Sequence, residues 1–292
     1  MVLFDITILT GHLAPASLAG YQQDVAAYQR FCGDPVAALE ATSLARWSTH
    51  LAQATRLSPH TINRKLAAVK RVVREAAAQG YVDSDTAEAF RRVRGLQVKA
   101  LKDRLKVRTW ITPAQMRILC DAPERATLRG WRDRALLATL AGSGCRVSEV
   151  VTLTVAQIQA QEGHFWLHVI GKNQTEPRDI PLSQEAYATI EAWLARRPVE
   201  SAYVFTSFAG KGRPPTPRPL DRSAALRVVR HYARQVGLQH ISPHSFRHFV
   251  GTEVAKKSGI RQAQLVLGHK DISSTARYVH DELAGGLTDG LY

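Results

Sequence analysis

The sequence contains few cysteines and no long hydrophobic run. Its 292 residues include three cysteines, Cys32, Cys120 and Cys145. This odd, scattered set does not fit a disulfide framework and is typical of proteins in a reducing cytoplasm. The apolar stretches fall well short of the roughly 20 residues that a membrane-spanning helix needs. Residues 1–5 lack the basic segment and the small-residue cleavage site of a signal peptide. The sequence therefore predicts a cytoplasmic protein without a membrane partner.

Acidic residues are scarce relative to basic ones. The chain has 39 lysines and arginines against 25 aspartates and glutamates, which gives a formal net charge of +14. Such an imbalance favours a polyanionic partner, and nucleic acid is the first candidate. An anionic membrane surface is the weaker alternative, because no long amphipathic lysine-rich helix stands alone in the sequence.

Hydrophobic periodicity predicts only helices in the first 90 residues. Apolar residues recur at helical spacing behind Ser17, Ser43 and Ser58, each of which could be a helix N-cap. The third helix would have Pro59 at its first position and end at Gly80. Its outer face carries five cations, either as a solvated basic face or as a face that follows DNA phosphates. These candidate DNA contacts are Arg64, Lys65, Lys70, Arg71 and Arg74.

A basic stretch separates these helices from the rest of the chain. Residues 91–108 hold eight cations and a single acid, Asp103. Like charges at this density repel one another, and a nucleic-acid backbone would satisfy them, although an exposed tether is the alternative. We predict a helical domain over residues 1–95, a basic linker over 96–108 and a second domain over 109–292. The cations expected to contact DNA here are Arg91, Arg92, Arg94, Lys99 and Lys102.

The second domain is predicted to combine helices with a small antiparallel hairpin. Residues 112–115 resemble a capping box that starts a helix. Residues 165–170 and 178–182 have the composition of two strands, with a turn at 171–173. The proline-rich segment 210–219 is predicted as a loop, because proline is unsuited to a central strand or a helix.

The C-terminal third gathers side chains that could grip a phosphodiester and attack it. Ser242 is placed to cap a helix on which His244 and Arg247, three positions apart, share a face. A basic pair at a helix start conflicts with the helix dipole unless an anion binds there. His269 and Tyr278 follow further along the chain. Each residue alone has an ordinary structural explanation, but imidazole, guanidinium and phenol together make a reaction centre.

This pattern is similar to that of the tyrosine recombinases, the lambda-integrase-like family that includes Xer, Cre and phage integrases. The matching stretches are Gly-Cys-Arg-Val-Ser-Glu at 144–149, Ile-Gly-Lys at 170–172, His-Ser-Phe-Arg-His at 244–248, Leu-Gly-His at 267–269 and Tyr278. Cys145 stands where many relatives have leucine, and we interpret it as a small buried hydrophobe. The resemblance implies a mainly helical fold. It consists of an N-terminal helical core-binding (SAM-like) domain and a mostly helical catalytic domain with a small antiparallel β-sheet.

The resemblance also implies which residues perform the chemistry. Tyr278 would attack a scissile phosphate to form a 3′-phosphotyrosyl bond and release a 5′-hydroxyl. Arg146 and Arg247 would hold the nonbridging oxygens, where negative charge grows in the transition state.

Four further residues would have supporting roles in that reaction. Lys172 would protonate the leaving 5′-oxygen, and His244 would help to remove the proton of the attacking phenol. His269 would hydrogen-bond the phosphate, and Glu149 would orient its neighbours. The reaction would need no metal and no ATP, because the phosphotyrosine conserves the energy of the broken bond.

The same resemblance implies how the protein would assemble. Its partners would be double-stranded DNA recombination sites and further copies of the chain, as a homotetramer that acts through a Holliday junction; a heteromeric partner is also possible. The two domains would form a C-shaped clamp around duplex DNA. An apolar stripe at Leu283, Leu287 and Leu291 is a candidate segment for docking into a neighbouring subunit. Xer-like dimer resolution, transposon cointegrate resolution and phage integration all remain open.

Other functions explain less of the sequence. His244 and His248 have a spacing compatible with zinc, but Arg247 lies between them and no His-Glu-x-x-His motif is present. The glycine-lysine pairs lack the spacing of a phosphate loop. A noncatalytic DNA-binding protein would explain the charge but not the ordered motifs. A type IB topoisomerase-like relaxing enzyme would share the chemistry without exchanging strands between duplexes.

Overall fold

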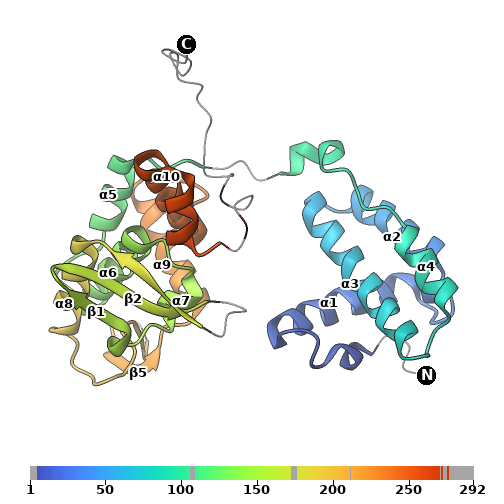
Figure 1. Cartoon of the computed structure of the whole chain (residues 1–292), viewed down its shortest axis with the longest axis horizontal. Coiled ribbons are helices and arrows are strands. Elements are labelled where there is room, and N and C mark those ends of the chain that lie inside the picture. Colours follow the sequence, from blue (N-terminus) through green and yellow to red (C-terminus); the bar gives the residue numbers. More distant parts are fainter. Residues whose placement is uncertain are drawn as a thin grey trace, which may run out of the picture. The chain divides into compact units, whose positions relative to one another are not determined.

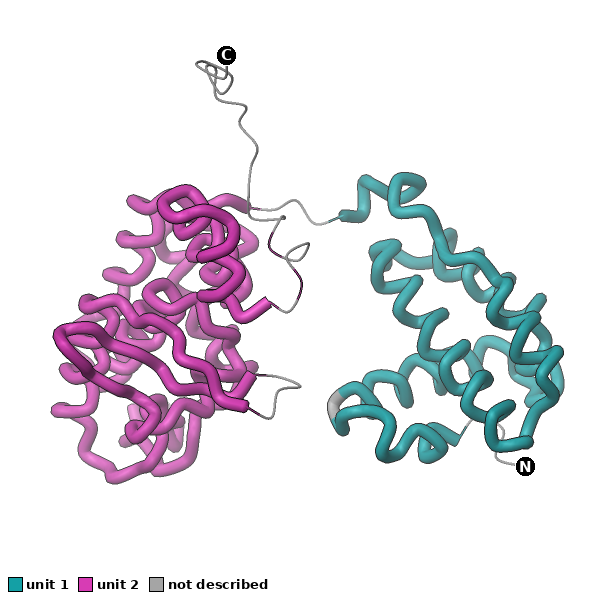
Figure 2. The backbone as a smooth tube through the Cα atoms, viewed as in Figure 1, with its two compact units in different colours: residues 1–107 teal, residues 108–292 magenta. Residues whose placement is uncertain are grey.

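Two separate hydrophobic cores divide the chain into units of residues 1–107 and 108–292 (Figure 2). The computed structural model describes residues 5–105, 109–171, 176–210, 212–269, 271 and 275. Helices dominate both units, and the second also contains small antiparallel sheets (Figure 1). The predicted fold class is thereby confirmed. Among the described helices, none combines the length and the apolar composition that crossing a membrane requires.

Unit 1 consists, over its described residues, of helices packed around an aliphatic and aromatic core. The helices are η1 (Ile6–Leu9), α1 (Pro15–Cys32), η2 (Ala37–Leu39), α2 (Ala41–Ala54), α3 (Pro59–Ala78), α4 (Ser84–Arg92) and η3 (Val98–Arg104). In the core, the rings of Tyr28 and Trp47 lie with their centroids 5.2 Å apart. The hydroxyl of Tyr28 donates to the carbonyl of Ala38 at 3.0 Å, which satisfies the polar end of a buried ring.

Two of the three predicted helix starts are wrong by three residues, because the N-caps are Ala14 and Glu40. α1 begins at Pro15 and α2 at Ala41, so Ser17 and Ser43 lie inside the helices. α1 begins without a side-chain cap, because its N-cap residue is Ala14, and Pro15 at the first position presets a helical φ. The third start is as predicted, because the hydroxyl of Ser58 accepts a hydrogen bond from the backbone N–H of Thr61 at 3.2 Å.

Part of the basic stretch at residues 91–108, including part of the predicted linker, is helical and packed. Arg91 and Arg92 belong to the last turn of α4, where both pair with Glu88. The segment Val98–Arg104 forms η3, and its last side chain donates to the carbonyl of Thr55 at 2.9 Å. The sequence argument considered the repulsion among these cations. It left out Glu88 and the backbone carbonyl of Thr55, which accept hydrogen bonds from three of them.

In unit 2, α6 lies at the centre of the core and contacts α5, α8 and α10. The elements are α5 (Pro113–Asp121), α6 (Leu128–Ser143), α7 (Val147–Val151), η4 (Val155–Gln157), β1 (Ile158–Gln161), β2 (His164–Ile170), β3 (Pro177–Leu182), α8 (Gln184–Leu194), β4 (Thr206–Phe208), β5 (Pro215–Pro219), α9 (Arg222–Gln235) and α10 (Pro243–Leu267). α5 begins with the predicted capping box between Thr112 and Gln115. α10 is interrupted at Gly259, whose φ of 81° is not helical.

The predicted hairpin forms the larger sheet, which has the order β1-β2-β3. Ile170 lies opposite Pro177 and Leu167 opposite Ile180, so the turn between β2 and β3 leaves from the end at Ile170. Alternate residues along each strand are buried against the core, among them Leu167 of β2 and its partner Ile180 of β3. Phe165 stacks on Tyr187 of α8 with ring centroids 3.9 Å apart. The strand β1 was not predicted.

The prediction of a loop over residues 210–219 is wrong in its second half. Residues 215–219 form β5, which pairs with β4 in a two-stranded antiparallel sheet. Each strand of such a sheet has one unpaired edge, and a proline there need not donate to the ladder. The proline content therefore excluded a central strand but not this edge strand.

Candidate active site

The turn between α6 and α7 carries Arg146. Gly144 ends α6 with a left-handed φ of 66°, and a Cβ there would lie 2.9 Å from a methyl carbon of Val250. A larger residue would thus meet both backbone strain and a clash. Cys145 is buried, and burial raises the pKa of its thiol to about 12, so the thiol stays neutral at physiological pH. Arg146 is the N-cap residue of α7, and 34% of its side chain is exposed.

Glu149 lies beneath Arg146 with 3% of its side chain exposed. Its carboxylate accepts hydrogen bonds from the backbone N–H of Arg146 at 2.8 Å and from Nη1 of the same residue at 3.0 Å. Arg178 of β3 donates from Nη2 to both carboxylate oxygens, each at 3.2 Å. One buried carboxylate is therefore shared by two guanidinium groups, which offsets the cost of burying its charge.

Arg247 is buried on α10 with 3% of its surface exposed. Its Nη1 donates to the carbonyl of Gly144 at 2.8 Å, and its Nη2 donates to the carbonyl of Leu267. α10 starts where the sequence predicted, and Ser242 and Ser245 form a capping box there. The guanidinium of Arg247 thus ties the turn before Arg146 to the end of α10.

Three histidines lie near the two ends of α10. His244 is exposed in the first turn, and its ring meets that of His248 edge-on at a centroid distance of 4.4 Å. His269 follows Gly268, which ends α10 with a φ of 60°. Nδ1 of His269 lies 2.9 Å from the hydroxyl oxygen of Thr275. His269 is therefore held at the C-terminal end of α10, where Arg247 is also anchored.

Hydrogen bonds from Arg247 connect it to the two segments that carry Arg146 and His269. The carbonyl partners of Arg247 lie two residues before Arg146 and two residues before His269. His244 lies one helical turn before Arg247 on α10. Lys172 and Tyr278 lie outside the described residues, as do the candidate docking leucines at 283, 287 and 291.

No group of three histidine, cysteine, aspartate or glutamate side chains that could hold a metal ion occurs within the described ranges. The paired rings of His244 and His248 thus lack a third ligand of these types in that part of the chain.

The sequence matches known domains in both units. Residues 109–284 match the phage integrase family, and residues 3–80 match the N-terminal SAM-like domain of phage integrases. The chain belongs to the phage integrase family. The phage integrase match covers most of unit 2, and the SAM-like match covers most of unit 1.

Similar members of the phage integrase family include Xer recombinases. The tyrosine recombinase XerC of Pelobacter propionicus is 30% identical over 281 residues, which cover 93% of this chain and 87% of that protein. The tyrosine recombinase XerD of Neisseria meningitidis serogroup B is 32% identical over 181 residues, which cover 59% of this chain and 58% of that protein. These matches confirm the resemblance read from the motifs, and the protein is a tyrosine site-specific recombinase. Neither alternative, a noncatalytic DNA-binding protein or a relaxing enzyme, is favoured.

Solved structures of the family share this fold. The Tn1549 transposon integrase in complex with circular intermediate DNA aligns with a TM-score of 0.71 and 17% identity, over 96% of this chain and 95% of that one. A lambda integrase dimer bound to a COC′ core site aligns with a TM-score of 0.69 and 18% identity, over 95% of this chain and 93% of that one.

Several cations of the SAM-like domain that were predicted to contact DNA have partners inside unit 1. Asp24 of α1 has 2% of its side chain exposed and pairs with both Arg64 and Lys65, the latter at 2.7 Å. Lys70 donates to two carbonyls at the C-terminal end of α4. These cations stabilise the packing of α3, and their contact with DNA stays a prediction.

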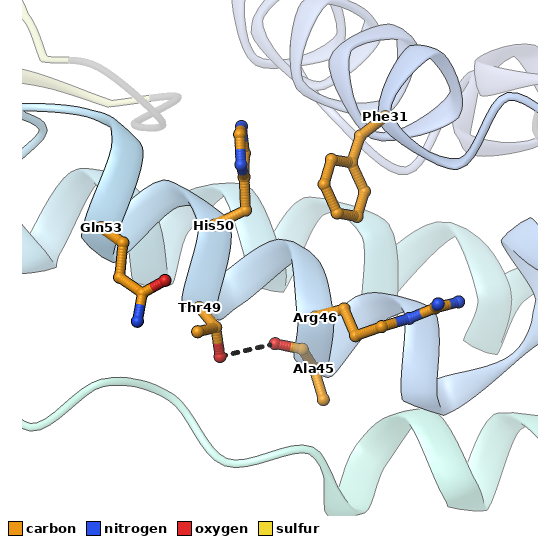
Figure 3. Close-up of a pocket in the computed structure, with 6 residues that line it drawn as sticks. All are labelled: Phe31, Ala45, Arg46, Thr49, His50 and Gln53. Atoms are coloured by element: carbon orange, nitrogen blue, oxygen red, sulfur yellow. Dashed lines mark hydrogen bonds between the residues drawn. The ribbon is translucent and has the colours of Figure 1, made fainter.

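A polar face of α2 was missed by the sequence reasoning. It borders a hollow lined by Phe31 of α1 and by Ala45, Arg46, Thr49, His50 and Gln53 of α2 (Figure 3). The rings of Phe31 and His50 lie side by side with centroids 5.0 Å apart. The four polar side chains are exposed, and Arg46 lies three and four residues before Thr49 and His50, which lie four and three residues before Gln53, so the four share one helix face. This face could have been identified from the sequence, because its polar residues have helical spacing and lie on the side of α2 opposite Leu44 and Trp47.

Proposed function

We propose that the protein exchanges strands between two double-stranded DNA recombination sites through a 3′-phosphotyrosyl intermediate and a Holliday junction. The observation that carries this proposal is the hydrogen-bonded connection of Arg146, Arg247 and His269 through the turn at Gly144 and the end of α10. These residue types suit a phosphate, because guanidinium groups match its oxygens in geometry and charge.

In the proposed cleavage step, the phenolic oxygen of Tyr278 attacks the scissile phosphorus. A bond forms between that oxygen and phosphorus as the bond from phosphorus to the 5′-oxygen breaks. Arg146 and Arg247 stabilise the negative charge that grows on the nonbridging oxygens. The two guanidinium groups do not have to reorganise, because Glu149 holds one and two backbone carbonyls hold the other.

Two proton transfers complete the proposed step. The proton of Tyr278 leaves with the help of His244, because a phenol with an ordinary pKa near 10 is a poor nucleophile at neutral pH. Lys172 donates a proton to the departing 5′-oxygen. His269, held by Thr275, donates a hydrogen bond to the phosphate. Attack by a 5′-hydroxyl of the other duplex then reverses the reaction and reseals the strand.

The relatives support DNA as the substrate. The two solved integrases described above were bound to DNA, one of them as a dimer on a core site. We propose a homotetramer on two synapsed sites, in which the stripe of leucines at 283–291 docks into a neighbouring subunit. We also place the protein in the cytoplasm, a proposal supported by its three thiols, all of which are free.

A strand-exchange experiment tests the proposed function. DNA that becomes covalently attached to the protein in cells is trapped and sequenced to identify the site. Two duplexes of different lengths that carry this site are then incubated with the protein and a metal chelator, and we expect recombinant products of new length. Relaxation of a supercoiled plasmid without recombinant products would instead identify a relaxing enzyme. Retarded DNA without any covalent adduct would identify a noncatalytic binding protein.

The polar face of α2 leads to a prediction about DNA recognition. Arginine and glutamine are side chains that read guanine and adenine in the major groove, and both occur on this exposed face. We expect Arg46→Ala to weaken binding to the identified site by about 1–3 kcal/mol, measured by fluorescence anisotropy at fixed salt. Arg46→Lys distinguishes the modes of contact, because lysine keeps a phosphate contact but loses a bidentate contact with a base. Unchanged affinity in Arg46→Ala would exclude this face from the interface.

A further inference from the structure

We propose that Arg178 is a positioning residue that sets the geometry of the phosphate-binding arginines. This inference rests on the proposed function, because it assigns a role to Arg178 within that site. Arg178 was not among the residues that the motifs singled out. It lies at the second position of β3, and 15% of its side chain is exposed.

The first support for this role is the carboxylate that Arg178 shares with Arg146. Nη2 of Arg178 reaches both oxygens of Glu149 at 3.2 Å, and Nη1 of Arg146 reaches one of them at 3.0 Å. A buried carboxylate with a single cationic partner would pair with it one to one and cancel its positive charge. Because Arg178 supplies a second positive charge, Glu149 can hold Arg146 in place without neutralising it. The proposed site therefore keeps its net positive charge toward a phosphate.

The second support is the contact of Arg178 with the end of α10. Its Nη1 donates to the carbonyl of Val266 at 3.3 Å. Its guanidinium lies directly against Gly268, where an added Cβ would fall 2.6 Å from Nη1 and 2.7 Å from Cζ. Because Gly268 has no side chain, the guanidinium of Arg178 can occupy the space beside it. Arg178 bridges the segment that carries Arg146 and the segment that carries His269.

The third support is the place of Arg178 on the hairpin. It pairs with Val169 in the sheet register, next to the pair Ile170–Pro177 from which the turn with Lys172 leaves. This end of the sheet is therefore connected, through the side chain of Arg178, to Glu149 and to the end of α10. A single side chain of β3 thus connects the segments that supply Arg146 and His269 in the proposed reaction.

The experiment measures the rate of covalent adduct formation in a single turnover on a nicked DNA site, with DNA affinity measured separately. We expect Arg178→Met to slow adduct formation by about 10- to 100-fold, by analogy with the loss found for side chains that orient metal ligands. DNA affinity should change little, because the side chain is mostly covered. Arg178→Lys should recover part of the rate, since lysine keeps the charge but cannot span Glu149 and Val266 together. Arg196→Met is the matched control, because Arg196 is exposed in the same unit and stacks on Trp131.

Two further variants separate positioning from a general loss of stability. In a Glu149→Gln background, Arg178→Met should slow the reaction by a smaller factor than in the wild type, because the shared carboxylate is already gone. Gly268→Ala should reproduce the rate loss of Arg178→Met, because its Cβ displaces the guanidinium. A wild-type rate in folded Arg178→Met or Arg178→Lys, or full additivity with Glu149→Gln, would overturn the inference. A wild-type protein that forms no adduct would overturn the proposed function, and the inference with it.

Discussion

Replacement of Tyr278 by phenylalanine is expected to abolish the covalent protein–DNA adduct while DNA affinity stays near that of the wild type. The substitution removes a single oxygen atom, which is the proposed nucleophile, and phenylalanine has no group that can attack phosphorus. The loss should be complete rather than partial, because no phosphotyrosyl bond can form without the phenolic oxygen. The measurement is a denaturing gel of protein incubated with end-labelled DNA that carries a nick beside the scissile phosphate.

A second tyrosine provides the control for this experiment. Tyr81 of unit 1 is 65% exposed, and Tyr81→Phe removes the same atom from a position outside the proposed site. The chain has eight tyrosines. An adduct that persists in Tyr278→Phe would show that another of them is the nucleophile. Loss of the adduct together with loss of DNA binding would point to a role of Tyr278 in binding.

Local signals in the sequence predicted much of the secondary structure and the proposed site. The caps at Ser58 and Thr112 and the pairing of β2 with β3 depend on interactions between residues close in the chain. The residues proposed for catalysis could be identified because their types and order follow the pattern of a family. Such signals require no knowledge of which segments meet in space.

The parts that the sequence did not reveal depend on contacts between distant segments. Asp24 pairs with Arg64 and Lys65 across the interface of α1 and α3, so a face that looked uniformly basic in the sequence is partly neutralised. Arg178 reaches Glu149 from 29 positions away, and neither spacing nor periodicity encodes that contact. The edge strand at 215–219 was hidden because its prolines argue against a strand until its partner is known.

Replacement of Arg247 by alanine is expected to slow adduct formation by about 10²- to 10³-fold, which corresponds to about 3–4 kcal/mol of barrier. The guanidinium is proposed to meet charge that develops only in the transition state, so its removal should lower the rate far more than the affinity for DNA. Single-turnover rates and binding constants, measured on the same DNA, separate the two effects.

The buried position of Arg247 adds a structural cost that the experiment has to separate from the catalytic one. The side chain satisfies the carbonyls of Gly144 and Leu267, and each acceptor left unsatisfied costs about 1–3 kcal/mol of stability. Arg247→Lys keeps the charge but cannot reach both carbonyls and a phosphate at once, because lysine lacks the planar fork of arginine. We therefore expect Arg247→Lys to be more stable than Arg247→Ala, yet still slow. Adduct formation at the wild-type rate in folded Arg247→Ala would exclude this guanidinium from the reaction and leave it a purely structural clamp between the two segments.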